Sequence, residues 1–294
     1  MISIIVPVLN EEASIITTIN SLIQTFKSKR YQFEIIIVDD GSTDDTKSNV
    51  RRYLKKISVN NIKLIEHAHN LGYGAALKTG IKNSKFRYCG IIDADSTYDP
   101  KDLLVAFDLL IKQGFDMVVG SRQGRFYLGN IRKRVLRLLL RTFVQYMTGR
   151  KIPDINSGLR VFSKDKVSEN ARLLSDKFSF TTSITLSFMM RNLFVSYIPV
   201  SYNNRRGETK VKLLADSFRT FGFVLSVAAY YNPLRIFFPL IALEIFVSTT
   251  MLALAGIVGN TALAICGVAL FLNGLIIFAI ALLAHLLSYK LGES

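Results

Sequence analysis

The stretch Tyr88-Cys-Gly-Ile-Ile-Asp-Ala-Asp-Ser-Thr-Tyr-Asp-Pro100 ends a short apolar run in two carboxylates, Asp93 and Asp95, with one residue between them. The apolar run predicts a buried strand, and residues i and i+2 of a strand face the same side. Two like charges held that close repel each other unless a cation lies between them. A turn is the other interpretation, because Asp99 and Pro100 are typical of turns.

Strand and helix patterns alternate on both sides of this stretch, over residues 1–122. Short apolar runs predict strands, and longer segments with one apolar face predict helices. The alternation predicts an α/β fold with a mostly parallel sheet covered by helices, in which ligands bind beyond the carboxyl ends of the strands. We expect strands at 2–6, 34–38, 62–66, 88–92 and 116–120, and helices at 13–26, 46–57, 73–83 and 101–113.

Four of the five predicted strands end in acids or hydrogen-bonding groups that would meet at one rim. Turn chemistry explains one or two of these groups but not the whole set, so their convergence favours a ligand site at one edge of the sheet. His67 and His69 have the spacing of metal ligands, although surface or loop positions are the more common role of such histidines. The groups in chain order are Asn10-Glu11-Glu12, Asp39-Asp40-Gly41-Ser42, His67-Ala68-His69-Asn70, Asp93 with Asp95, and Ser121-Arg122.

Three common kinds of site are excluded by motif. The chain has no Gly-x4-Gly-Lys-Ser/Thr stretch and therefore no P-loop. Gly72-Tyr73-Gly74 lacks the third glycine of a dinucleotide fingerprint and follows the third predicted strand, not the first. A Ser-His-Asp triad has no nucleophile-elbow motif to support it.

Two long apolar stretches follow the α/β part. Residues 236–258 are apolar except for Glu244 and a few Ser and Thr, and residues 261–287 are apolar except for Asn273 and His285. Each stretch exceeds the roughly 20 residues that cross a hydrocarbon core. Buried helices of a soluble core are seldom so long and so uniformly apolar. The sequence therefore predicts two membrane spans.

The connection Gly259-Asn260 is so short that the two spans form a hairpin with both ends on one side. Folding the hairpin there brings Glu244 to nearly the depth of Asn273. Because a charged group in a span is usually paired, we expect a hydrogen bond between these two side chains, within or between subunits. The sequence leaves open whether the chain forms a homo-oligomer.

The formal net charge of +15 belongs entirely to residues 1–232, because the charged residues beyond Asn232 cancel. Positive flanks stay on the cytoplasmic side, so we expect an integral membrane protein whose large domain is cytoplasmic. A basic surface beside a membrane favours anionic lipid headgroups and phosphorylated ligands, and no nucleic-acid partner is expected. Met1 leads straight into an apolar strand, which does not suggest a signal peptide. Cys89 lies in a predicted strand of the α/β part and Cys266 in a predicted membrane span, so we do not expect them to form a disulfide. Two unpaired cysteines fit a reducing compartment.

Seven motifs follow one another along the α/β part: Ile4-Ile-Val-Pro-Val-Leu-Asn-Glu-Glu12, Ile37-Val-Asp-Asp-Gly-Ser-Thr-Asp-Asp-Thr46, Asn70-Leu-Gly-Tyr-Gly-Ala-Ala-Leu-Lys-Thr-Gly80, Asp93-Ala-Asp95, Gly120-Ser-Arg122, Asp154-Ile-Asn-Ser-Gly-Leu-Arg-Val-Phe162 and Arg206-Gly-Glu-Thr-Lys210. In this order they resemble the family 2 glycosyltransferases with a GT-A fold. The last three resemble the polyprenyl-phosphate branch, which includes dolichol-phosphate mannose synthases and bacterial undecaprenyl-phosphate relatives. The resemblance spans about residues 2–212.

The resemblance implies a nucleotide-diphosphate sugar as donor and a Mg²⁺ or Mn²⁺ ion held by Asp93 and Asp95, with the cation stabilising the leaving nucleotide. In some relatives a Gln two residues past the second Asp also touches the metal, and Thr97 stands there in this chain. The residues implied to bind the nucleotide are Pro7, Asn10, Glu11, Asp39, Asp40, Gly72, Lys78 and Ala94. Acids such as Glu11 and Glu12 also suit a helix N-terminus.

The acceptor implied by the resemblance is a polyprenyl phosphate, dolichyl or undecaprenyl. A lipid monophosphate is already an anion at neutral pH, so it needs basic side chains that position it more than a base. The implied acceptor-phosphate residues are Arg122, Ser157, Arg160, Arg206 and Lys210, and the implied catalytic residues are Asp93, Asp95, Asp154 and Arg122.

Two positions leave alternatives open. Asp154 has three alternative interpretations: a general base, a residue that orients the acceptor, or a cap of the turn before Ser157-Gly158. Many relatives carry a Glu in the helix after a Phe-Ser-Phe-like stretch, whereas residues 178–184 of this chain offer only hydroxyls.

We therefore predict a metal-dependent, inverting transferase that moves a sugar onto a polyprenyl phosphate at the cytoplasmic face. One alternative is a glycosyltransferase that extends a lipid-linked glycan or polysaccharide hydroxyl with Asp154 as base, and another is an inactive membrane adaptor that keeps the fold. The predicted domains are a GT-A domain at 1–210, an amphipathic juxtamembrane helix at 211–233 and the transmembrane hairpin at 234–294.

Overall fold

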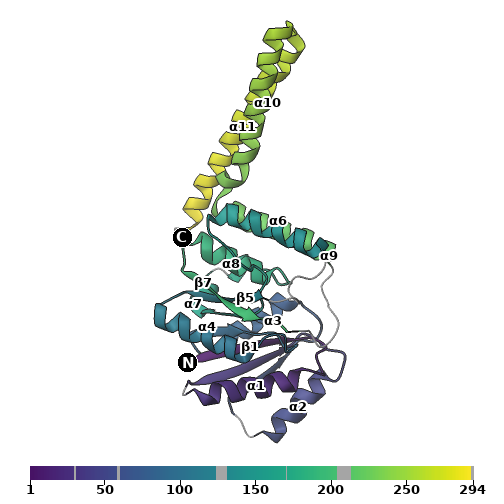
Figure 1. Cartoon of the computed structure of the whole chain (residues 1–294), viewed down its shortest axis with the longest axis vertical. Helices are drawn as coiled ribbons and strands as arrows, with labels where there is room; N and C mark the ends of the chain where they lie inside the picture. The colour runs from purple at the N-terminus through teal and green to yellow at the C-terminus, as the bar shows by residue number, and fades with distance from the viewer. Residues whose placement is uncertain (30, 58–59, 124–130, 170, 204–212, 293–294) are drawn as a thin grey trace. The chain divides into compact units, whose positions relative to one another are not determined.

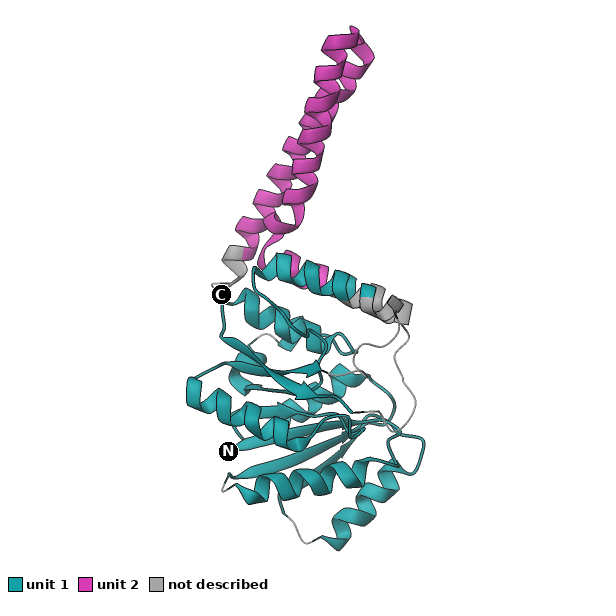
Figure 2. Ribbon diagram, in the orientation of Figure 1, with its two compact units in different colours: residues 1–223 teal, residues 224–294 magenta. Residues whose placement is uncertain are grey.

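The computed structural model describes residues 1–29, 31–57, 60–123, 131–169, 171–203 and 213–292 (Figure 1). The chain divides into two compact units, residues 1–223 and 224–294 (Figure 2). The three-part division expected from the sequence, with bounds at 210 and 233, stays a prediction.

In the described part of the first unit, strands form one sheet in the order β3-β2-β1-β4-β6-β5-β7. β6 is antiparallel to β4 and to β5, and the other neighbouring strands pair in parallel. The carboxyl ends of β1 to β5 therefore meet at one edge, as the sequence predicts. The strands are β1 Ile2–Val8, β2 Phe33–Asp39, β3 Ile62–Glu66, β4 Tyr88–Ile91, β5 Met117–Gln123, β6 Arg160–Ser163 and β7 Val195–Ser201.

Helices cover both faces of this sheet (Figure 1). Alternate residues of a strand point to opposite faces, so Ile4 and Ile35 enter one core while Ile5 and Ile91 enter the other. The first core is closed by α1 Ile15–Ser28, α2 Thr46–Lys56 and α4 Pro100–Gln113. The second is closed by α3 Tyr73–Lys82, α7 Lys164–Ser168 and α8 Phe180–Met190.

Both ends of α4 are capped by residues suited to those positions. Asp99 is the N-cap of α4 and accepts a hydrogen bond from the backbone N of Lys101, and Pro100 takes the first helical position. Gly114 ends the same helix in the left-handed conformation that glycine adopts without strain. The turn chemistry seen in Asp99-Pro100 thus belongs to the start of α4. The remaining helices are α6 Ile131–Thr148, the 3-10 turn η1 Ala171–Leu173, and α9 Leu213–Tyr231.

The second unit contains a pair of long helices, α10 Pro233–Val258 and α11 Thr261–Gly292. By length and composition, α10 and residues 261–288 of α11 are each able to cross a membrane. Gly259 turns the chain between them in the left-handed region, with φ +68°. Asn273 Nδ2 donates to Glu244 Oε1 at 2.8 Å, which confirms the predicted hydrogen bond and places it within one chain.

Candidate active site

The two acids of the opening stretch lie in the turn that follows β4, not in the strand itself. Asp95 is buried, and its Oδ1 accepts hydrogen bonds from the backbone N and the Oγ1 of Thr97 at 3.1 and 2.6 Å. Thr97, which stands where some relatives have a metal-touching Gln, therefore holds the second acid in place. Ala94, between the acids, is buried, and its carbonyl accepts from Thr18 Oγ1 at 3.0 Å. The two acids thus lie in a turn, and the ligand site expected at them stays a prediction.

Asp93 is held by residues from other elements. Its Oδ1 accepts a hydrogen bond from the Tyr73 hydroxyl at 2.9 Å. Burial and the charge of Asp93 raise the pKa of Tyr73, so this hydroxyl keeps its proton and is the donor. A Cβ on Gly158 would lie 2.3 Å from Asp93 Oδ2, so glycine is needed for the two segments to approach this closely.

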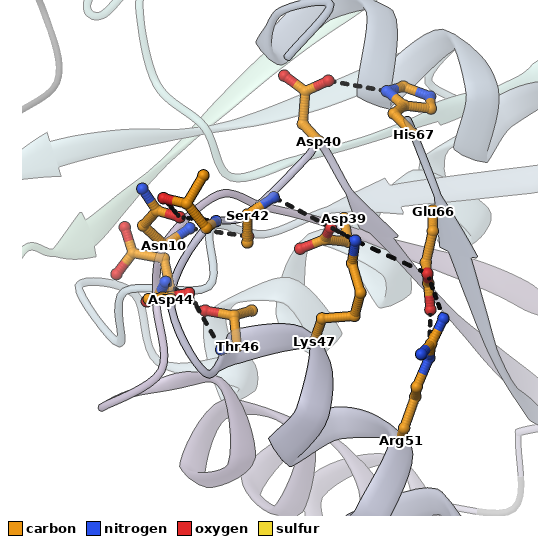
Figure 3. Close-up of polar contacts among 12 residues, drawn as sticks. Asn10, Asp39, Asp40, Ser42, Asp44, Thr46, Lys47, Arg51, Glu66 and His67 are labelled. Carbon is orange, nitrogen blue, oxygen red and sulfur yellow. Dashed lines mark hydrogen bonds and ion pairs between the residues drawn. The ribbon is translucent and has the colours of Figure 1, made fainter. Parts of the chain in front are cut away.

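Asp39, at the end of β2, faces the loop that opens α2 (Figure 3). Its Oδ2 accepts from the backbone N of Ser42 at 3.1 Å and lies 3.7 Å from Lys47 Nζ. Its Oδ1 is buried and has no hydrogen-bond partner in the part of the chain that the structure describes. A buried carboxylate oxygen without a donor is costly, and a ligand is one way to supply that donor.

Asp40 points the other way and is fully engaged by its own chain (Figure 3). Its Oδ2 accepts from the backbone N of Gly72 at 2.8 Å, and its Oδ1 accepts from the backbone N of Leu71 at 2.9 Å. Oδ1 also lies 2.8 Å from His67 Nδ1, while His67 Nε2 lies 2.9 Å from Thr79 Oγ1. Both ring nitrogens of His67 are therefore occupied, which favours the loop role over metal binding. His69 is exposed.

The loop after β1 is tied to the loop after β2. Asn10 has a positive φ of 48°, its backbone N donates to Ser42 Oγ at 2.9 Å, and its Oδ1 accepts from the backbone N of Thr43 at 2.8 Å. The backbone N of Glu11 donates to Thr46 Oγ1 at 2.8 Å. Pro7 pairs in register with Val38 of β2. The predicted nucleotide residues of β1 and β2 thus form one connected rim.

Two further predicted nucleotide residues lie beside the segment before α8. Gly72 has a φ of +117°, and a Cβ there would lie 2.5 Å from the carbonyl oxygen of Asp176. Lys78, on α3, forms an ion pair with Asp176 at 2.8 Å.

Arg122, at the end of β5, is paired with Asp154. Arg122 Nε lies 2.7 Å from Asp154 Oδ2 and Nη2 lies 2.9 Å from Oδ1, which is the bidentate arrangement of a strong ion pair. Burial on its own raises the pKa of Asp154, but the Arg122 charge and the hydrogen bonds from Arg122 and Asn156 outweigh it and hold that pKa below its usual value. A carboxylate so stabilised is a poor proton acceptor at neutral pH.

Arg160, in β6, is fully buried; its two terminal nitrogens donate to protein acceptors, while its Nε has no hydrogen-bond partner in the described part of the chain. Its Nη2 donates to the carbonyl of Ser157 at 2.6 Å, and its Nη1 donates to the carbonyl of Thr181 and to Thr185 Oγ1 at 3.0 and 3.2 Å. The hydroxyls of α8 thus take part in holding this guanidinium. Ser157 Oγ lies 3.2 Å from the Tyr98 hydroxyl, which also accepts from the backbone N of Gly158 at 3.0 Å. The other predicted acceptor residues, Arg206 and Lys210, lie outside the described residues.

Three aromatic residues at this edge were not singled out from the sequence. Tyr73 bonds Asp93, Tyr98 bonds the 157–158 turn, and the ring of Tyr202 lies 5.4 Å from the Arg122 guanidinium. Tyr98 belongs to the quoted stretch and lies three residues after Asp95, so its closeness to the two acids in the sequence could have indicated its place in the site. Tyr73 lies within the 70–80 motif, where it was given no role, and nothing in the local pattern marks Tyr202.

The sequence of the chain matches a known family. The family model described as glycosyl transferase family 2 matches residues 3–170, which is more than half of the chain. The chain therefore belongs to the family 2 glycosyltransferases, and the predicted family is confirmed.

The chain is also similar to individual curated relatives. The chain is 28% identical over 220 residues to the dolichyl-phosphate beta-glucosyltransferase of Dictyostelium discoideum, covering 70% of this chain and 67% of the relative. It is 27% identical over 179 residues to the dodecaprenyl-phosphate galacturonate synthase of Rhizobium johnstonii, covering 61% of this chain and 52% of the relative. The chain thus spans between half and two thirds of the length of these two relatives.

Solved structures show the same fold. Glucosyl-3-phosphoglycerate synthase from Mycobacterium tuberculosis, in complex with Mn²⁺, UDP and phosphoglyceric acid, superposes with a TM-score of 0.60 at 20% identity, covering 78% of each chain. The same enzyme with Mg²⁺ and UDP gives a TM-score of 0.61 at 20% identity, covering 78% of this chain and 79% of the other. The expected GT-A fold with a mostly parallel sheet is confirmed.

Proposed function

We propose that this chain transfers a sugar from a nucleotide-diphosphate sugar to a polyprenyl phosphate at a membrane surface. The observation that carries the proposal is the pair Asp93 and Asp95 at the carboxyl edge of the sheet, each held by a hydroxyl, from Tyr73 and Thr97 respectively. Dolichyl-phosphate and dodecaprenyl-phosphate sugar synthases among the relatives supply the substrate class.

A divalent cation fits the two acids. Hard carboxylate oxygens suit Mg²⁺ or Mn²⁺, and ligating carboxylates are commonly oriented by further hydrogen bonds such as those from Tyr73 and Thr97. Asp93 and Asp95 would hold the cation, and donor phosphate oxygens or water would be its further ligands. The described residues contain no cluster of three or more His, Cys, Asp and Glu side chains that could hold a metal on its own. When bound, the cation stabilises the charge that develops on the departing nucleotide.

The nucleotide lies over the rim formed by the loops after β1 and β2. Asp39 Oδ1, buried and without a donor in the described part of the chain, accepts a hydrogen bond from the nucleoside. Asn10 and Glu11 shape the rim through their bonds to the loop that opens α2. Asp40 holds the 67–72 loop in position instead of touching the ligand.

The acceptor chemistry follows from the state of Asp154. A hydroxyl acceptor needs a base, and Asp154 is held ionised by Arg122 with a lowered pKa. A lipid phosphate needs no base. Its oxygen forms a bond to the anomeric carbon as the bond from that carbon to the donor diphosphate breaks on the opposite face, which inverts the configuration. Arg122, with Arg206 and Lys210, supplies positive charge for the acceptor phosphate.

The membrane association has two supports. Two helices are long and apolar enough to span a bilayer. Helix α6 also exposes Val135, Leu138 and Leu139, of which Leu139 is 62% exposed. Exposed apolar side chains on a helix that also carries several arginines suit the headgroup region of a membrane. The excess of positive charge in residues 1–232 supports a cytoplasmic position for the first unit.

The test compares Asp93→Asn/Asp95→Asn with Asp99→Asn in the full chain, purified in detergent. Asp99 caps α4 within the same stretch, and Asn is as good a cap, so this control is expected to keep activity. Transfer of labelled sugar from UDP- and GDP-sugars to polyprenyl phosphate is measured with Mn²⁺. Normal transfer by the double variant would overturn the proposal. Activity only on a lipid-linked oligosaccharide would favour a hydroxyl acceptor, and nucleotide binding without turnover on any acceptor would favour an adaptor.

A further inference from the structure

The hydrogen bond from Tyr73 to Asp93 joins two distant parts of the site. Asp95 is held by Thr97, two residues further along the same turn. Asp93 instead receives its bond from the first residue of α3, twenty residues earlier in the chain, at 2.9 Å. The orientation of the first acid therefore depends on where α3 begins.

The ring of Tyr73 is itself held in place. It stacks on Phe178, with ring centroids 5.7 Å apart and planes at 14°. The neighbouring backbone is fixed by the segment before α8: the backbone N of Ala75 donates to the carbonyl of Asp176 at 3.0 Å, and Lys177 Nζ donates to the carbonyl of Leu71 at 2.6 Å. A hydroxyl on a ring so confined loses little freedom when it makes its hydrogen bond.

The carboxylate of Asp93 is confined from the opposite side as well. A Cβ at Gly158 would lie 2.3 Å from Oδ2 and 2.7 Å from Cγ, so the backbone of the 157–158 turn lies directly against this group. Tyr73 on one oxygen and Gly158 beside the other leave the carboxylate little room to rotate. A ligand carboxylate held in one orientation binds a cation without first giving up rotational freedom.

We propose that Tyr73 is a positioning residue for the divalent cation, which it serves by fixing the carboxylate of Asp93. The inference rests on the proposed cation at Asp93 and Asp95. It assigns the phenol a role that does not require contact with the nucleotide, the sugar or the lipid. Groups that orient a metal-binding side chain in this way typically change metal affinity about 10- to 100-fold when they are removed.

The chain contains a matched control. Tyr31 donates to Asp108 Oδ1 at 2.7 Å, which is also a phenol-to-carboxylate hydrogen bond, but between α4 and the segment before β2. Tyr73→Phe and Tyr31→Phe each remove one oxygen and keep the ring. The experiment titrates the full chain in detergent with Mn²⁺, alone and with UDP or GDP, and follows free Mn²⁺ by its electron paramagnetic resonance signal.

Tyr73→Phe is expected to weaken Mn²⁺ binding by about 10- to 100-fold, whereas Tyr31→Phe stays within about twofold of the wild-type chain. The melting temperatures of the two variants without metal are expected to be similar. With transfer as a second readout, Tyr73→Phe should need more Mn²⁺ for half-maximal rate but recover most of kcat at saturating Mn²⁺. Phe178→Leu, which keeps the Tyr73 hydroxyl and removes the stacking, should weaken Mn²⁺ binding by less than Tyr73→Phe does.

Unchanged Mn²⁺ affinity in Tyr73→Phe, beside saturable binding by the wild-type chain, would overturn this inference and leave the proposed function intact. A loss of kcat that saturating Mn²⁺ does not restore would also overturn it, since the phenol would then act on the substrates. Absence of saturable Mn²⁺ binding by the wild-type chain, with or without nucleotide, would overturn the proposed cation site and this inference with it.

Discussion

Arg122 and Asp154 form a bidentate ion pair, with Nε 2.7 Å from Oδ2 and Nη2 2.9 Å from Oδ1. The backbone N of Arg122 donates to the same Oδ2 at 3.2 Å, so Asp154 also fixes the end of β5. Asp154 is 1% exposed, and a buried pair of this kind leaves a costly unpaired charge when one partner is removed. The pair thus links the edge of the sheet to the 154–160 turn that reaches Asp93.

Asp154→Asn is expected to lower the free energy of unfolding by about 3–5 kcal/mol at pH 7, because Arg122, whose side chain is 14% exposed, loses the carboxylate that balances its charge. The matched control is Asp176→Asn, which breaks an exposed ion pair with Lys78 and should cost less than about 1 kcal/mol. Thermal melting of the full chain in detergent measures both. Equal, small losses in the two variants would contradict the structural role of the buried pair.

The same pair predicts a direction for the pH dependence. The folded-state pKa of Asp154 lies below its unfolded value, so its contribution to stability is fully present above the unfolded pKa of about 3.9. That contribution is lost as pH falls through the lower, folded-state pKa. The difference in melting temperature between the wild-type chain and Asp154→Asn should therefore be large at pH 7 and shrink on acidification below about pH 4. A difference that grows on acidification would contradict this assignment.

Asp39 and Asp40 are neighbours with separate roles, and asparagine substitutions should distinguish them. Asp39→Asn is expected to lower nucleotide affinity by about tenfold or more, the value of a hydrogen bond to a charged group. Asp40→Asn is expected chiefly to lower the melting temperature, because one amide oxygen cannot serve the acceptor roles toward Leu71, Gly72 and His67. Thermal-shift titrations with UDP and GDP measure both quantities. A pure affinity loss in Asp40→Asn would reverse these roles.

Arg160 offers a test between two roles for one residue. The sequence predicts an acceptor-phosphate contact, whereas the structure surrounds its buried guanidinium with the Ser157 and Thr181 carbonyls and the Thr185 hydroxyl. Arg160→Lys keeps the positive charge but loses the planar guanidinium, whose nitrogens reach several acceptors at once. It should therefore lower the melting temperature, and the free energy of unfolding should fall by about 1–3 kcal/mol for each acceptor left unsatisfied. KM for polyprenyl phosphate should stay unchanged. A raised KM at unchanged melting temperature would favour the phosphate contact.

The first half of the fold could be predicted from the sequence because its signals are local. Apolar runs closed by polar turns placed β1 to β4 within two residues of their observed bounds at either end. The strand β6 lacks such a signal: it has four residues, begins with the buried Arg160, and pairs antiparallel between strands distant in sequence. Helix α8 has no apolar periodicity, because it buries Thr and Ser as well as apolar side chains.

The candidate site was predictable as a set of strand ends but not as a set of contacts. Period-two alternation says that Asp39 and Asp40 point to opposite sides, but not which side meets the 67–72 loop. The position of Tyr73 beside Asp93 depends on the packing of α3 against the segment before α8, which no local pattern encodes. Contacts of this kind arise only when segments distant in the sequence are packed together.

In the hairpin, Glu244 and Asn273 form a hydrogen bond at 2.8 Å, and Ser248 Oγ donates to the carbonyl of Gly267 at 2.7 Å. Hydrogen bonds between membrane helices are worth about 0.6 kcal/mol on average and up to about 1.7 kcal/mol. A double-mutant cycle with Glu244→Leu and Asn273→Leu, measured by thermal melting of the full chain in lipid nanodiscs, should give a coupling energy in this range. Thr249 provides the control, because among the described residues its hydroxyl bonds within α10, to Ile245 and Phe246. Thr249→Val with Asn273→Leu should be additive. Additivity in both cycles would show that the Glu244–Asn273 bond does not hold the two helices together.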